Sequence, residues 1–149
     1  MFKKTVFCLL IGCLALAKSI EVPDALIDET LSACMKETDI DKAKLSEMFD
    51  DDFHIKYPHD VTSKIVECGL GKVHFFNEDG GFNSKFVTED LAKSLPVFVT
   101  DEIDAKKADE LAKEIYHECS TPKGENLVEK MANFHNCVMV ELKKKTTAA

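Results

Sequence analysis

The sequence predicts an all-α fold, a compact six-helix domain held by disulfide bridges. Apolar residues recur every three or four positions along most of the chain, which is the spacing of one face of a helix. Prolines and glycines interrupt that pattern and separate the helices. Four cysteines follow the first nineteen residues, each on the apolar stripe of a different helix: Cys34, Cys68, Cys119 and Cys137. They can close two disulfides, and the sequence alone leaves three pairings open.

The first segment has the features of a secretory signal peptide in the right order. Lys3 and Lys4 precede an apolar run over residues 6–17, and Ala15-Leu16-Ala17 supplies a small-residue cleavage site. The run is shorter than the about 20 residues of a transmembrane helix, although a buried helix or an anchor is the alternative. We expect residues 1–19 to be removed and residues 20–149 to form one domain, secreted into extracellular fluid, where disulfides persist.

The charge of the chain excludes several classes of partner. The formal net charge is −8, and the basic residues are all lysine. Nucleic acids and anionic membrane surfaces need cationic neutralisation, which an acidic chain without arginine does not supply. We therefore expect no nucleic-acid partner and no stable membrane insertion.

The first two helices are expected over residues 23–37 and 41–49. Pro23 suits a first-turn position, and Asp41 is a favourable N-cap. A run of three aspartates, residues 50–52, ends the second helix at the surface. The inward-facing residues are Ile27, Leu31, Cys34, Leu45 and Met48.

A third helix is expected over residues 59–70, with Gly69 and Gly71 marking its end. Its apolar face consists of Val61, Ile65 and Cys68. Residues 72–87 leave two alternatives open around the turn Asp79-Gly80-Gly81. They form either a short hairpin or a loop that packs its phenylalanines inward.

Three more helices follow. One starts at a Thr88 cap and stops near Leu95, because Pro96 comes next. Another runs to about residue 119 from a cap at Thr100 or Asp101, and the last covers residues 125–143, with a frayed tail after residue 145. The stripes of the last two helices are Ile103, Leu111, Ile115 and Cys119, then Leu127, Met131, Phe134, Val138 and Leu142.

The cysteine spacing resembles that of the insect odorant-binding (pheromone-binding) protein family. The four cysteines match the first, third, fourth and sixth of the six that members usually carry, and the second and fifth would fall at Lys64 and Val128. Those two are bonded to each other in the family, so the chain resembles the minus-C subgroup. The loop at 76–83 and the pair Leu95-Pro96 also resemble the family, whereas the 50 residues between Cys68 and Cys119 are more than usual.

The resemblance implies six helices around an apolar cavity, and the bridges Cys34–Cys68 and Cys119–Cys137. It implies a carrier of small hydrophobic ligands such as odorants, pheromones, fatty-chain molecules or terpenoids, with no enzymatic activity and no cofactor. A chemoreceptor is a candidate downstream partner, and we expect a monomer or weak dimer. Without a bridge near Lys64 and Val128, the third and sixth helices are free to shift, which predicts an adaptable cavity.

Apolar stripes supply the candidate ligand-binding residues, although stripe membership alone does not separate a filled core from a pocket. Tyr116 is included as a hydrogen-bonding group. The set is Phe76, Leu91, Leu95, Phe98, Leu111, Ile115, Tyr116, Met131, Phe134, Val138 and Leu142.

Motifs of catalysis or metal binding are absent from the sequence. There is no G-x-S-x-G, no H-E-x-x-H and no C-x-x-C pair, and the loop at 77–81 lacks the ligands of a calcium site. The five histidines are scattered and are expected to be structural. The alternative is a pH switch near pH 5–6, for which His135 is the first candidate.

Two alternatives to an olfactory carrier remain at this stage. One is a carrier of the same kind in saliva, venom or reproductive fluid. The other is a saposin-like lipid-surface protein, which the acidic, evenly spread charge disfavours. A hydrolase is least expected, because no nucleophile and base can be named.

Overall fold

The computed structural model describes residues 20–99 and 102–147. These residues form six α-helices, one short 3-10 helix and no β-strand, which confirms the all-α prediction. The expected signal peptide lies outside the described residues. The elements are η1 (Asp24–Leu26), α2 (Glu29–Thr38), α3 (Lys42–Ser46), α4 (Asp60–Lys72), α5 (Ser84–Phe98), α6 (Ala105–Cys119) and α7 (Leu127–Thr147).

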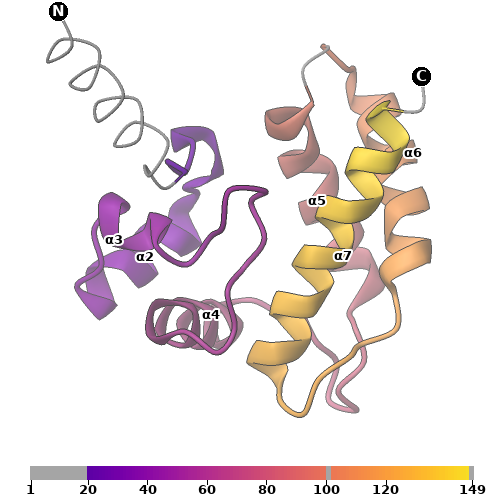
Figure 1. Ribbon diagram of the computed structural model, residues 1–149. Coiled ribbons are helices and arrows are strands. Elements are labelled where there is room, and N and C mark those ends of the chain that lie inside the picture. Colours follow the sequence, from indigo (N-terminus) through magenta and orange to yellow (C-terminus); the bar gives the residue numbers. More distant parts are fainter. Residues whose placement is uncertain (1–19, 100–101, 148–149) are drawn as a thin grey trace, which may run out of the picture.

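The helices form two groups, which are visible in Figure 1. Helix α2 packs on α4, and α3 lies beside them. Helix α6 packs on α5 and on α7. Contacts between α4 and α7 join the two groups, so α7 belongs to both.

Short acidic and amide side chains start most of the helices. Asp28, Asp41 and Asp104 each accept a hydrogen bond at 2.8 Å from the backbone N–H three residues ahead, which begins α2, α3 and α6. Asn83 does the same for α5 at 3.3 Å. The predicted Asp41 cap is therefore confirmed. Thr100 and Asp101 lie outside the described residues, but a helix start there is wrong, because residues 102–104 are not helical and Asp104 caps α6.

The sequence-derived bounds of the first and third helices need correction. The first predicted helix is divided, because the chain makes the 3-10 helix η1 after Pro23 and then restarts at the Asp28 cap. The third continues through Gly69 and Gly71 to Lys72. A glycine disfavours the interior of a helix only modestly, so two glycines in the last turns do not end it.

The fourth predicted helix starts too late and ends too early. Asn83 caps α5, and Thr88 lies inside it, where its hydroxyl donates to the carbonyl oxygen of Ser84 at 2.7 Å. Pro96 lies in the last turn and the helix reaches Phe98, because a proline there removes only one hydrogen bond near the helix end. The final helix, α7, also runs to Thr147, beyond the predicted end at 143.

The segment between α4 and α5 is a loop whose phenylalanines point inward. Phe76 and Phe82 form an isolated antiparallel bridge, and Phe75 and Phe82 are buried. The segment combines features of the two predicted alternatives: backbone hydrogen bonds from Asn77 to Gly81 and from Asn83 to Phe75 close a hairpin-like turn, and its phenylalanines pack inward.

Both disulfides pair as the family resemblance implied. Cys34 of α2 bonds to Cys68 of α4 with an S–S distance of 2.09 Å, and Cys119 of α6 bonds to Cys137 of α7 at 2.08 Å. Each bridge lies within one group of helices. The bridge Cys119–Cys137 includes α7, the helix that contacts both groups, and the bridge Cys34–Cys68 does not.

The buried side chains form two cores. The N-terminal core consists of Val22, Cys34, Ile40, Leu45, Met48, Phe53, Ile55, Val61, Ile65, Val66, Val128 and Ala132. The C-terminal core consists of Phe75, Phe82, Val87, Leu91, Leu95, Ala112, Ile115, Cys119, Phe134, Val138 and Leu142. The phenylalanine rings pack closely in the second core, where the ring centroids of Phe82 and Phe134 lie 4.8 Å apart.

Candidate functional site

A cavity of about 440 Å³ lies against the N-terminal core. Its walls are mostly apolar and come from η1, α2, α3, α4, the loop at 49–55, the loop that follows α4, most of the length of α5, and α7. The apolar lining includes Leu26, Leu31, Leu45, Met48, Phe49, Phe53, Ile55, Ile65, Val66, Leu70, Phe98 and Met131. A space of this size and character suits one small hydrophobic molecule.

Polar side chains gather where the cavity reaches the surface. Asp28, Asp90 and Lys93 line it and are exposed. Protein atoms crowd the carboxyl of Asp90 although the residue as a whole is exposed, and this desolvation raises its pKa. The negative charge of Asp28 raises that pKa further, while Lys93 opposes the effect. The mouth is therefore charged, in contrast to the interior.

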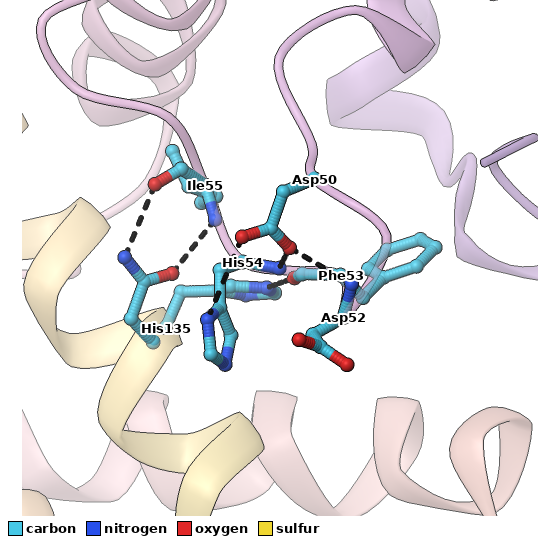
Figure 2. Close-up of polar contacts among 7 residues, drawn as sticks. Asp50, Asp52, Phe53, His54, Ile55 and His135 are labelled. Atoms are coloured by element: carbon cyan, nitrogen blue, oxygen red, sulfur yellow. Dashed lines mark hydrogen bonds and ion pairs between the residues drawn. The ribbon is translucent and has the colours of Figure 1, made fainter. Parts of the chain in front are cut away.

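The loop at 49–55 forms one wall of the cavity and folds back on itself. Phe49 and Ile55 form an antiparallel bridge. The carboxylate of Asp50 accepts hydrogen bonds at 2.9 Å from the backbone N–H groups of Asp52 and His54, as Figure 2 shows. Phe53 has φ +64°, a left-handed conformation that is uncommon for a residue with a side chain. The turn places the rings of Phe49 and Phe53 in the cavity lining, with their centroids 4.5 Å apart.

Helix α7 holds this loop in place. The side chain of Asn136 accepts from the N–H of Ile55 at 2.7 Å and donates to its carbonyl oxygen at 3.1 Å. The Nε2 atom of His135 lies 2.8 Å from the carbonyl oxygen of Phe53. Two consecutive residues of one helix thus satisfy three backbone groups of the loop (Figure 2).

His135 is neutral in this environment. The residue keeps some accessible surface because it lines the cavity, yet protein encloses its ring. This desolvation lowers the pKa of His135 from 6.5 to about 4, although the hydrogen bond to Phe53 and the charge of Asp50 act in the opposite direction. Nearby His54 lowers the pKa slightly further. The alternative in which His135 gains a charge near pH 5–6 is therefore not supported, because the lowered pKa keeps the ring neutral down to about pH 4. The contact with Phe53 instead agrees with the expected structural role of the histidine.

The structure separates the candidate ligand-binding residues. Phe98 and Met131 line the cavity. Leu142 borders a second, open groove of about 620 Å³ along the end of α7. All of the candidates except Phe98 and Met131, Leu142 included, belong to the C-terminal core or pack against it without lining the cavity, and a ligand contact by them stays a prediction: Phe76, Leu91, Leu95, Leu111, Ile115, Tyr116, Phe134, Val138 and Leu142.

The residues of the loop wall were not predicted from the sequence. Phe49 and Phe53 flank the three aspartates, which predicted a solvated surface segment. No local signal identified them, because two aromatic residues four positions apart do not require a common apolar contact. Leu31 and Ile65 were predicted to face inward, but nothing distinguished an inward stripe beside a cavity from one in a filled core.

Metal binding and membrane insertion find no support in the described ranges. No group of three histidine, cysteine, aspartate or glutamate residues there lies close enough to hold a metal ion. None of the helices in residues 20–99 and 102–147 combines the length and apolar character that a membrane span requires.

Comparison with known proteins gives one match. The sequence profile of the PBP/GOBP family matches residues 23–141, which include both disulfides and every residue that lines the cavity except Val22. No curated protein and no solved structure matches the chain significantly. The six-helix fold and the apolar cavity are consistent with the family that the profile match indicates. The chain belongs to the PBP/GOBP family, the non-enzymatic pheromone- and odorant-binding carriers of small hydrophobic ligands.

Proposed function

We propose that residues 1–19 are cleaved and that residues 20–149 act as an extracellular carrier of the minus-C type, which holds one hydrophobic molecule in the cavity behind the loop at 49–55. The observation that supports this most directly is the apolar cavity of about 440 Å³. The fatty-chain and terpenoid molecules of the predicted ligand class have the size and apolar character that it accommodates.

The apolar surface that a ligand buries limits the affinity that we expect for this carrier. Burying ten methylene groups is worth roughly 8 kcal/mol, and immobilising the ligand takes back part of that gain. A dissociation constant near 1 µM corresponds to about −8 kcal/mol. Micromolar binding is therefore the tightest that we expect for a ligand that contributes only apolar contacts.

The minus-C assignment rests on the positions of the two absent cysteines. Lys64 and Val128 belong to α4 and α7, which contact each other. Each described cysteine is already bonded, so none is left over for a third bridge in residues 20–99 and 102–147.

The test is a titration of the mature, oxidised protein with an apolar fluorescent dye, followed by displacement with fatty alcohols, fatty acids and terpenoids. The Val66→Phe variant adds a ring to the cavity wall, and we expect it to weaken dye binding at least several-fold. The matched control is Val140→Phe, which adds the same ring to an exposed position in the second groove.

The possible results distinguish binding in the cavity, binding in the second groove and association with a lipid surface. Saturation at one dye per chain, lost in Val66→Phe and kept in Val140→Phe, supports the cavity. The reverse pattern moves the ligand to the second groove. No saturable binding by the folded protein, together with co-sedimentation with liposomes, supports the saposin-like alternative. Detection of the protein in sensory tissue, as opposed to saliva, venom or reproductive fluid, distinguishes an olfactory carrier from a carrier elsewhere.

A further inference from the structure

His135 presents one nitrogen to the loop and leaves the other without a partner. Nε2 lies 2.8 Å from the carbonyl oxygen of Phe53, and a carbonyl oxygen only accepts hydrogen bonds. Nε2 must therefore carry the proton. In a neutral imidazole the second nitrogen, Nδ1, is then an acceptor.

Nδ1 of His135 can act as an acceptor because the imidazole is neutral. The lowered pKa of His135, about 4, keeps the imidazole neutral at physiological pH. The charged and titratable groups that act on it are Asp50 and His54, both from the loop at 49–55. Among the described residues, the hydrogen bond to Phe53 is the only one that the ring makes. Nδ1 keeps accessible surface, since it is not among the buried side-chain atoms that lack a partner. A ligand that covers Nδ1 without donating to it displaces water and leaves the acceptor unpaired, which costs free energy, whereas a ligand with a donor avoids that cost.

The surroundings of His135 are aromatic. The ring centroids of Phe49 and Phe53 lie 5.8 and 6.5 Å from that of His135, and Phe98 packs edge-on against Phe53 at 5.2 Å. All four side chains line the cavity, and His135 is the only imidazole among the described residues that do so. The charged lining residues Asp28, Asp90 and Lys93 are exposed at the mouth. Thr30 and Ser94 also line the cavity and are half-buried. Among the aromatic side chains of the lining, His135 is the polar group placed to distinguish ligands.

We propose that Nδ1 of His135 accepts a hydrogen bond from a hydroxyl group of the ligand, so that the cavity selects apolar alcohols over aldehydes, ketones, esters and ionised acids of the same chain. This rests on the proposed function, because it names the ligand class of the same cavity. An aldehyde or an ester has no proton to donate and leaves Nδ1 unpaired. An ionised carboxylate brings a charge into an apolar space and also lacks a donor.

The experiment compares ligands that differ only in the polar end. Dodecanol, dodecanal and dodecyl acetate are competed against the bound dye, first on the wild-type protein. We expect dodecanol to bind roughly 2- to 10-fold tighter than the other two, which is the range of one net hydrogen bond. In His135→Phe, which keeps an aromatic ring and removes both nitrogens, the three ligands should bind equally.

The matched control is Asn136→Ala. His135→Phe also frees the carbonyl oxygen of Phe53 and loosens the loop, whereas Asn136→Ala loosens the same loop at Ile55 and keeps the imidazole. Asn136→Ala should therefore preserve the preference for dodecanol even if it weakens all three ligands. Loss of the preference in both variants assigns it to loop order and overturns the role of Nδ1.

A second measurement on the wild-type protein does not depend on whether His135→Phe folds. The ¹⁵N resonance of His135 Nδ1 should shift on addition of dodecanol and not on addition of dodecanal. Saturable binding of all three ligands with equal affinity and no such shift overturns this inference and leaves the carrier function standing. Absence of any saturable binding overturns both.

Discussion

In the C-terminal group, α6 packs on α5 and on α7, and the rings of Phe75, Phe82 and Phe134 belong to the filled core of this group. In the N-terminal group, α2 and α4 face the loop at 49–55 across an open cavity. Both groups have one disulfide and helices with ordinary apolar stripes. The difference arises because a loop with two aromatic side chains stands where a third helix would fill the space.

The contrast shows that a cavity depends on the element opposite a helix as much as on the helix itself. Leu31 and Ile65 lie at the same kind of stripe position as Leu91 and Ile115. The first two border the cavity, and the last two are buried in a filled core. Three changes to the protein or its conditions test this difference between the two groups.

The largest expected effect comes from truncating one phenylalanine in each group. Phe134→Ala removes a ring that is packed against Phe82 and Phe75, with centroids 4.8 and 5.7 Å away, and should destabilise the protein by about 3–5 kcal/mol. Phe49→Ala removes a ring that already faces open space, so we expect a loss of only about 1–2 kcal/mol. Urea unfolding of both variants measures the difference.

Dye binding by the same two variants tests where the ligand lies. Phe49→Ala should weaken binding, and Phe134→Ala should leave the dissociation constant of the folded protein unchanged. A stronger loss in Phe134→Ala would move the ligand to the C-terminal core, where most of the sequence-derived candidate residues lie.

A covalent link between the two groups is the second change. Lys64→Cys combined with Val128→Cys places cysteines at the two positions that the family fills, on contacting helices α4 and α7. A bridge between them should raise the free energy of unfolding by roughly 2–4 kcal/mol and narrow the range of ligands that bind. The single Val128→Cys variant is the control for the lost burial of Val128. Two free thiols after oxidation would show that the positions do not face each other.

The third change is a change of pH. Burial lowers the folded-state pKa of His135 from 6.5 to about 4, so the unfolded chain binds more protons than the folded one between those values. The contribution of neutral His135 to the free energy of unfolding is fully present above pH 6.5. It falls by about 1–3 kcal/mol as the pH decreases toward 4. Below pH 4 both states are protonated and the loss stops.

The His135→Phe variant isolates this effect from the carboxylates. The difference in unfolding free energy between wild type and variant should vary between pH 6.5 and 4 and be constant at higher pH. A difference that is flat across the whole range would show that the His135 ring is hydrated in the folded protein.

The parts of the structure that could be predicted from the sequence are those that neighbouring residues determine. Helical stripes and the Asp41 cap follow from neighbouring residues, and the cysteine spacing carried the family pairing. The start of α5 was wrong because Asn83 and Thr88 are both good caps, and only packing of the preceding phenylalanine loop decides between them. The wall of the cavity was not predictable, because Asn136 holds Ile55 across 81 positions of the chain.

Helix α7 is the shared wall of both groups. Met131 and His135 face the cavity, Phe134, Val138 and Leu142 belong to the C-terminal core, Cys137 closes a bridge, and Asn136 binds the loop. Mutational tolerance should therefore be distributed unevenly around the cavity. Substitutions on α2, α4 or the loop can reshape the ligand space without disturbing the filled group, whereas most substitutions between positions 131 and 142 of α7 affect two functions at once. New ligand preferences in descendants of this chain are expected to evolve from the walls that face α7.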